Sequence, residues 1–452
     1  MSRRTRLLSM CLLLFSVLLA ACGGSAASDS SAQLTMWTWK VAHIPGLQAI
    51  ADDFKSKTGI SVKVSAYNPD DAYRTKLTTA GQSGQLPDIV SYWAGSQWDL
   101  AASGLLEDLT GKVDSSWQKN FMPGTYTKTS VLTQSVFESC QKDPKCTYKN
   151  LKVGQSFSVP YMAGQSFFVY ANKTLLQQAG LDPNTLPKTA EEWLDMMKTV
   201  KSKTGTAGLV TGVKNTGVLE NWLFRPLLMT SCGVDTYDAI YNGKDSFTNP
   251  CSMRVLNWMN QVSTNKLWIP DILNTDIDPG DTAFSQGKAA FDIGGTYTLS
   301  FLLQQGMKAS DIIPFPVPAL QGSVYSQLKI GAISLIDAGI AKNSTHQQEA
   351  LQFLKFMTSS DEMAKFAKIV GDLPAVKISD DPAAVGPVLP GLLKGLSPDS
   401  PFNQSQAQPK SDMQSVLDVG LQKFITGETT PSALAQKTDT ANKAAWKAAG
   451  GS

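Results

Sequence analysis

The chain has 452 residues, with 40 Lys and Arg, 38 Asp and Glu, and a formal net charge of +2. This near-neutral balance argues against binding to nucleic acid or to an anionic membrane surface, because both need a surplus of basic residues. Beyond the first 21 residues, no apolar run approaches the roughly 18 residues of a membrane span, and no GxxxxGK[ST] phosphate loop occurs. We therefore expect neither a membrane channel nor an ATPase of that type.

The N-terminus has the pattern of an export signal. Three arginines precede an apolar run over residues 7–21, which ends in Leu-Ala-Ala-Cys. The run is too short for a comfortable membrane helix, so residues 1–21 are predicted to be a signal peptide. We expect Cys22 to carry the lipid of a bacterial lipoprotein and residues 22–32 to form a flexible tether. The alternative is an ordinary secretory signal beside an incidental cysteine.

Four cysteines remain after the signal and the lipidation site, namely Cys140, Cys146, Cys232 and Cys251. An even number in an exported protein favours disulfides. Three pairings exist, and we favour Cys140 with Cys146 and Cys232 with Cys251 because short loops close most readily. Each bridge would add about 2–3 kcal/mol in the chain-entropy model. The absence of CxxC spacing disfavours zinc, and we predict no metal site and no cofactor.

The first elements follow an alternating pattern. An apolar strand over 34–37 precedes a helix with apolar residues at helical spacing over 47–54, and a second strand follows over 60–64. A helix over 71–82 and a strand near Ile89 extend the series. This order predicts an α/β fold with a parallel sheet covered on both faces.

Aromatic residues follow two of these strands. Trp39 comes after the first strand, and Tyr92 and Trp93 come after the strand near Ile89. Ligands gather at the carboxyl ends of parallel strands, so these rings are expected on one rim. The alternative is ordinary packing. Further along, we interpret 117–157 as an insertion and 347–357 as a helix.

Eight phrases in order resemble a known family, the extracellular sugar-binding proteins of ABC importers, of the maltose-binding type. They are AIADDFKSKTGISVKV, TAGQSGQLPDIV, GLLEDLT, VPY with YANKTLLQQAGLDP, FSQGKAAFDIGGTY, IIPFPVPA, AKNSTHQQEALQFLKFMTSSD with GDLPAV, and FITGETTPSAL. The resemblance implies a two-lobe type II periplasmic-binding-protein fold, each lobe a mainly parallel sheet flanked by helices. One lobe would contain 33–162 and 322–376, and the other 163–321 and 377–452, with several crossing segments between them.

The resemblance also implies a sugar site in the cleft between the lobes. Flat rings suit the apolar face of a pyranose and fixed polar groups suit its hydroxyls. The positions carried over are Tyr92, Trp93, Gln165, Glu220, Trp222, Gly295 and Tyr297, and Trp39 is expected to add a stacking ring. Three alternatives stay open: Trp222 as a packing residue, Glu220 as a solvated carboxylate, and Arg225 as either an anion ligand or a structural ion pair.

The expected function is that of a monomeric substrate-binding lipoprotein outside the cytoplasm. It would capture a carbohydrate, close around it and deliver it to a membrane permease served by a separate ATPase. No nucleic acid and no catalytic residue is expected. An exported glycoside hydrolase is the alternative enzyme, but only Glu220 has a plausible place in the cleft and that chemistry needs two carboxyl groups. A lipid-anchored polysaccharide-binding protein is the other alternative.

Overall fold

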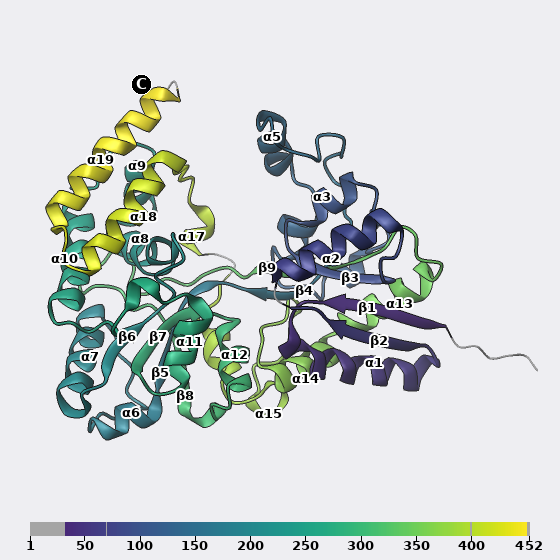
Figure 1. Ribbon diagram of the computed structural model, residues 1–452, viewed down its shortest axis with the longest axis horizontal. Coiled ribbons are helices and arrows are strands. Elements are labelled where there is room, and N and C mark those ends of the chain that lie inside the picture. The colour runs from purple at the N-terminus through teal and green to yellow at the C-terminus, as the bar shows by residue number, and fades with distance from the viewer. Residues whose placement is uncertain (1–31, 69, 398–399, 450–452) are drawn as a thin grey trace, which may run out of the picture.

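The computed structural model describes residues 32–449, apart from 69 and 398–399. The predicted signal peptide, Cys22 and most of the tether lie outside the described residues. Two lobes stand side by side, each with its own sheet, joined in the middle of the molecule (Figure 1). Within the described part of the chain, no helix is both long and apolar enough to cross a membrane.

The first lobe has a five-stranded sheet in the order β2-β1-β3-β9-β4. Its strands are β1 Gln33–Thr38, β2 Ser61–Ala66, β3 Ile89–Trp93, β4 Val159–Gly164 and β9 Ile333–Ile340. Its helices are η1 Val41–His43, α1 Ile44–Thr58, α2 Asp70–Ser83, α3 Gln97–Ala102, α4 Ser115–Gln118, η2 Tyr126–Ser130, α5 Gln134–Lys142, α13 Gln347–Met357 and α14 Ser360–Val370. The expected strand–helix–strand start and the helix over 347–357 are confirmed.

Helix α1 illustrates how the sequence sets these elements. Its apolar residues Leu47, Ile50 and Phe54 fall at helical spacing and are all buried. The helix ends at Gly59, whose φ of 79° is a left-handed conformation that glycine adopts without a side-chain penalty. The buried face of α1 therefore packs on the sheet and against α14.

The second lobe has a four-stranded sheet in the order β6-β7-β5-β8. Its strands are β5 Ser166–Asn172, β6 Ala207–Val210, β7 Ala289–Gly295 and β8 Ile312–Pro316. Its helices before the last crossing are α6 Lys173–Gln178, α7 Ala190–Thr204, η3 Glu220–Phe224, α8 Arg225–Cys232, α9 Val234–Tyr241, α10 Pro250–Thr264, η4 Ile272–Asn274, α11 Ile277–Ser285, α12 Thr298–Gln304 and η5 Ala309–Asp311. The later helices are α15 Pro382–Val385, α16 Leu389–Lys394, α17 Pro401–Gln404, α18 Ser411–Ile425 and α19 Pro431–Ala448.

Both sheets are mixed, which corrects the expectation of mainly parallel sheets. In the first lobe, β1 pairs in parallel with β2 and β3, whereas β9 pairs antiparallel with both β3 and β4. In the second lobe, only β6 and β7 are parallel. The antiparallel strands β4, β5 and β9 adjoin the crossings between the lobes. A strand that arrives from the other lobe need not follow a crossover helix, so the parallel rule does not apply to it.

Three crossings join the lobes and are hydrogen bonded to one another. Gln165, between β4 and β5, donates from Nε2 to the carbonyl of Gly331 at 2.9 Å. In the third crossing, the carbonyl of Leu373 accepts a hydrogen bond from Ala163 N at 2.9 Å, and Ala375 N donates to the carbonyl of Tyr161 at 3.0 Å. These bonds hold the three crossings together as one hinge.

One predicted lobe boundary needs correction. The segment 322–330 was assigned to the first lobe, but it packs on the second. Leu328 and Ile330 belong to the second-lobe core, and Tyr325 N donates to the carbonyl of Thr230 at 3.1 Å. The second crossing therefore begins near 331, just before β9.

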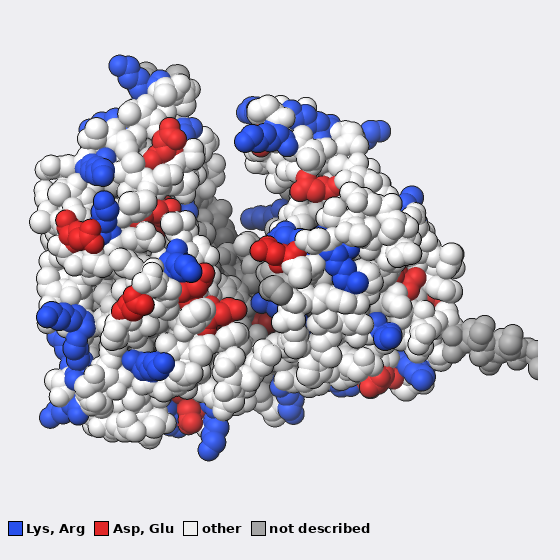
Figure 2. Space-filling view, viewed as in Figure 1, with Lys and Arg blue, Asp and Glu red and all other residues white. Residues whose placement is uncertain are grey.

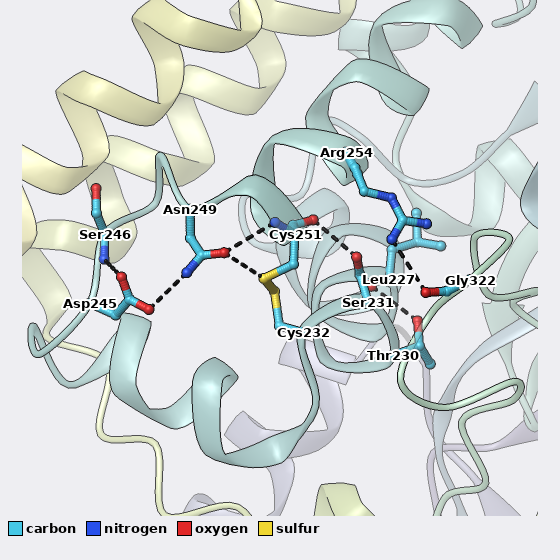
Figure 3. Close-up of a disulfide and its surroundings, with 10 residues drawn as sticks. All are labelled: Leu227, Thr230, Ser231, Cys232, Asp245, Ser246, Asn249, Cys251, Arg254 and Gly322. Carbon is cyan, nitrogen blue, oxygen red and sulfur yellow. Dashed lines mark hydrogen bonds between the residues drawn. A yellow bond between two sulfur atoms is a disulfide. The ribbon is translucent and has the colours of Figure 1, made fainter.

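Both disulfides match the favoured pairing. Cys140 and Cys146 are joined within the insertion, with Cα atoms 5.3 Å apart, and Cys232 and Cys251 link α8 to α10 with Cα atoms 5.2 Å apart. Figure 3 shows the second bridge beside Asn249, whose side chain caps α10 by accepting from Cys251 N at 3.1 Å. The bridge thus fixes the end of α8 to the start of α10.

Candidate ligand-binding cleft

A deep hollow separates the two lobes in the space-filling view (Figure 2). The loops that follow β1 and β7 face each other across it, because Lys40 Nζ from the first lobe lies 5.9 Å from the ring centroid of Tyr297 in the second. The ends of these strands therefore supply opposite walls of the cleft, as the strand-end argument requires.

The first wall is a stack of aromatic rings. Trp39 and Trp93 are stacked, with centroids 3.9 Å apart and planes 26° apart, and Tyr73 contacts both rings, with its centroid 5.8 Å from that of Trp39 and 6.1 Å from that of Trp93. Trp39 is only 3% exposed, whereas Trp93 is half-buried. Trp93 is thus the ring that the first wall offers to the cleft, and Trp39 supports it from behind.

Tyr92 does not face the cleft, which corrects its assignment to the rim. It lies within β3 and is 1% exposed in the first-lobe core. Its hydroxyl donates to the carbonyl of Phe157 at 3.3 Å, and burial raises its pKa well above the ordinary value. Successive side chains in a strand point to opposite faces, so Tyr92 and Trp93 cannot share one. We leave Tyr92 out of the proposed site.

The second wall pairs Trp222 with Tyr297. Their rings meet edge to face, with centroids 6.2 Å apart and planes 61° apart. Trp222 is 8% exposed and packs in the second-lobe core, while Tyr297 is half-buried. Gly295 is required beside Tyr297, because a side chain there would collide with the tyrosine ring. Tyr297 is therefore the more exposed ring of this wall, and Trp222 is the more buried one.

Gln165 lies at the first crossing and is 8% exposed. Its side-chain amide nitrogen donates to Gly331 O at 2.9 Å, and its backbone carbonyl accepts from Thr296 N at 2.9 Å. The residue therefore ties β7 and β9 to the hinge. Its side-chain amide also has an oxygen, which can accept a hydrogen bond from a ligand.

Glu220 is fully buried, so the alternative of a solvated carboxylate is wrong. Tyr241 donates to Glu220 Oε1 at 3.0 Å, and Arg225 Nε lies 3.9 Å from the same oxygen. Burial raises the pKa of Glu220 to about 7; the nearby Arg225 lowers it and Asp418 raises it. Arg225 is also bonded to Asn221 and Tyr237. The structure supports the ion-pair interpretation of Arg225 and places this cluster behind the wall.

A second buried carboxyl pair lies beneath the loop that carries Tyr297. Asp281 of α11 and Asp292 of β7 are buried on elements that pack against each other. Burial raises the pKa of Asp281 well above its ordinary value, and the neighbouring Asp292 raises it further. Burial also raises the pKa of Asp292 to about 7. Each carboxyl therefore binds a proton more readily in the folded protein than in the unfolded chain.

A polar network crosses the hinge between the lobes. His43 Nε2, from the first lobe, donates to Asp372 Oδ2 at 2.7 Å, and Ser300 Oγ of the second lobe lies 3.0 Å from the same oxygen. Asp372 belongs to the third crossing and is 2% exposed. One carboxylate of the third crossing therefore links the first lobe to the second.

We expect Ser300→Ala to lower the free energy of unfolding by about 1–2 kcal/mol, because a buried carboxylate oxygen loses a hydrogen-bond donor. Urea unfolding followed by tryptophan fluorescence measures the change. Ser56→Ala is the matched control, since that hydroxyl bonds on an exposed surface of α1 and should change stability by less than about 0.5 kcal/mol. Equal effects of the two substitutions would contradict a role for Ser300 in the hinge.

Sequence reasoning missed several residues of this region. Arg74, on the helix expected over 71–82, places its guanidinium carbon 3.6 Å from the ring centroid of Trp93. A lone arginine on an exposed helix face has no distinguishing pattern, and only the folded arrangement brings it to an indole.

A separate groove of about 720 Å³ lies between β8 and α16 and contains none of the predicted residues. The described residues contain no group of three or more candidate metal ligands.

Comparisons with known proteins agree with this architecture. Residues 41–364 match the family model described as bacterial extracellular solute-binding protein. The Multiple sugar-binding protein of Streptococcus mutans is 26% identical over 390 residues, which cover 80% of this chain and 80% of that protein. The sn-glycerol-3-phosphate-binding periplasmic protein UgpB of Escherichia coli is 24% identical over 247 residues, 52% of each chain.

Among solved structures, the GacH receptor of Streptomyces glaucescens, studied unliganded and in complex with acarbose, has a TM-score of 0.60 and 18% identity. The match covers 92% of this chain and 99% of that one. At this identity the likeness shows the fold, and it confirms the two-lobe architecture expected from the eight sequence phrases.

Proposed function

Because this chain belongs to the bacterial extracellular solute-binding protein family, we propose that it is the carbohydrate-capturing component of an ABC importer. The relative from Streptococcus mutans is named for sugar binding, and it is matched over four fifths of its length. The proposal treats the cleft between the lobes as the ligand site and assigns no catalytic residue to it.

The observation that carries the proposal is the pair of aromatic walls at the hinge. Trp93 stacks with Trp39 in the first lobe, Tyr297 contacts Trp222 in the second, and Lys40 of the first lobe lies 5.9 Å from the ring centroid of Tyr297, which supports a site between the two aromatic pairs. Rings on both sides suit the two apolar faces of a sugar, and the amide of Gln165 at the crossing suits its hydroxyls. A ligand held by both walls contacts the two lobes at once.

Closure would follow from that double contact. A sugar stabilises the closed state only by the difference between its affinities for the closed and open states. The crossings are hydrogen bonded to each other, so the lobes can rotate about them as rigid bodies. The closed form would then dock on a permease whose separate ATPase supplies the work.

The cellular setting completes the proposal. Removal of residues 1–21 and lipidation of Cys22 would attach the folded lobes to the outer face of a membrane through a short tether. Two acyl chains suffice for stable attachment. The protein would act there as a monomer, with the carbohydrate and the permease as its partners.

Titration of the full mature chain with a panel of oligosaccharides tests the proposal. Saturable one-to-one binding by calorimetry, with a smaller radius of gyration in solution scattering, is the expected result. Turnover of a bound oligosaccharide would instead indicate a glycoside hydrolase. Binding without compaction would favour a tethered polysaccharide-binding protein. Absence of binding across the panel would refute carbohydrate capture.

A further inference from the structure

Each half-buried ring of the proposed site carries a cation from the first lobe. The guanidinium of Arg74 lies over Trp93 at 3.6 Å, and the ammonium of Lys40 lies 5.9 Å from the centroid of Tyr297. Arg74 is exposed and Lys40 is half-buried, so neither side chain is committed to the core. The first lobe therefore supplies both cations, one over its own ring Trp93 and one near the second-lobe ring Tyr297.

Arg74 occupies the face of Trp93 that a sugar would use. Trp39 covers one face of this indole with its centroid at 3.9 Å, and a guanidinium only 3.6 Å from the same centroid has to lie over the other face. A neutral sugar must displace Arg74 before it can stack on this face, and the protein then loses the cation–π contact between Arg74 and Trp93. An anionic sugar can recruit the guanidinium instead.

In the part of the chain that the structure describes, neither Arg74 nor Lys40 forms an ion pair with a carboxylate. The one carboxylate predicted for the site, Glu220, is fully buried and engaged with Tyr241 and Arg225. Sugar hydroxyls need acceptors as well as donors, whereas Arg and Lys side chains only donate. The charged groups placed at the cleft thus suit an anion better than a neutral polyol.

Resting on the carbohydrate proposal above, we propose that this cleft selects a saccharide bearing an anionic substituent, a carboxylate or a phosphate, with Arg74 and Lys40 as its specificity-determining residues. The sugar ring would stack at Trp93 and Tyr297 while the anion accepts from the two cations. Arg74 presents a planar fork of donors that matches either oxyanion.

The test compares matched pairs of ligands by calorimetry: gluco-, galacto-, manno- and xylo-oligosaccharides in neutral form, as uronates and as sugar phosphates. We expect at least one anionic form to bind about tenfold or more tightly than its neutral partner, and its affinity to fall as sodium chloride rises. The uronate and phosphate arms identify the anion. Tighter binding of the neutral form in every pair that binds would overturn the inference while leaving carbohydrate capture intact.

Substitution of Arg74 gives an independent test, because it should change the affinities for anionic and neutral ligands differently. Arg74→Gln should weaken the anionic ligand about tenfold and leave a neutral sugar unchanged or bound more tightly, because the face of Trp93 becomes clear. Lys76→Gln on the same helix is the matched control: its ammonium lies over Trp37 and Tyr67, which are not rings of the proposed site. Equal loss for neutral and anionic ligands in Arg74→Gln, or the same loss in Lys76→Gln, would refute the assignment. Binding of no member of any pair would refute the carbohydrate proposal itself.

Discussion

Raising the pH from about 5 to about 8 should destabilise the protein, by an amount on the order of 2–3 kcal/mol from Asp292 alone, and Asp281 acts in the same direction. In the unfolded chain both carboxyls lose their protons near the ordinary value for Asp. In the native state burial raises the pKa of Asp292 to about 7 and that of Asp281 well above its ordinary value. The native state therefore holds more protons between these limits, and its stability falls as the pH rises through them.

Other groups shape the same curve. Glu220, whose pKa burial raises to about 7, acts in the same direction. Lys112 and Lys342 lower the pKa of Glu107, so the ionised Glu107 stabilises the folded state. This stabilisation is lost only as the pH falls through the lowered pKa, below the ordinary range of a carboxylate. The two sets act at different pH, so maximal stability is expected in mildly acidic solution.

Urea unfolding at a series of pH values measures the effect, and variants assign it. The double substitution Asp281→Asn with Asp292→Asn keeps polar groups at both positions without a titrating proton, so it should flatten the curve between about pH 5 and pH 8. Asp195→Asn is the control, because that carboxylate is 75% exposed and should leave the slope unchanged. A slope retained in the double variant would show that other groups cause it.

The sequence predicts the fold of this protein well where local patterns dominate. The apolar run over 34–37 predicts strand β1 and the apolar spacing over 47–54 predicts helix α1, and the structure confirms both. Strand direction is different. Whether β9 runs parallel or antiparallel to β3 depends on which lobe the chain arrives from, and nothing within β9 records that. The same long-range origin explains the misplaced segment 322–330.

The site shows the same division between local and long-range information. The position of Trp93 at the end of β3 follows from local reasoning, but its partner Arg74 comes from a different element and meets it only after folding. Tyr92 was misplaced because a shift of one residue along a strand moves a side chain to the other face. Glu220 was predicted as a ligand residue, with a solvated carboxylate as the alternative. Its burial could not be foreseen because it depends on α9 and on residues of α18, far along the chain.

Trp222→Ala should lower the free energy of unfolding by about 3–5 kcal/mol, the usual cost of removing a large aromatic side chain from a core. Trp222 is 8% exposed, belongs to the second-lobe core and supports Tyr297 edge to face. Its loss should also weaken sugar binding, because Tyr297 loses the edge-to-face contact that Trp222 provides. Urea unfolding and calorimetry with a bound oligosaccharide measure the two effects.

Trp93→Ala separates binding from stability. Trp93 is half-buried and lies at the end of β3, so its removal should cost less stability than that of Trp222 while reducing affinity by about 2 kcal/mol, or roughly thirtyfold. Trp222→Phe keeps an aromatic ring behind Tyr297 and should recover most of the stability lost in Trp222→Ala. Unchanged affinity in Trp93→Ala, together with unchanged stability in Trp222→Ala, would contradict the assignment of one ring to the ligand and the other to the supporting core.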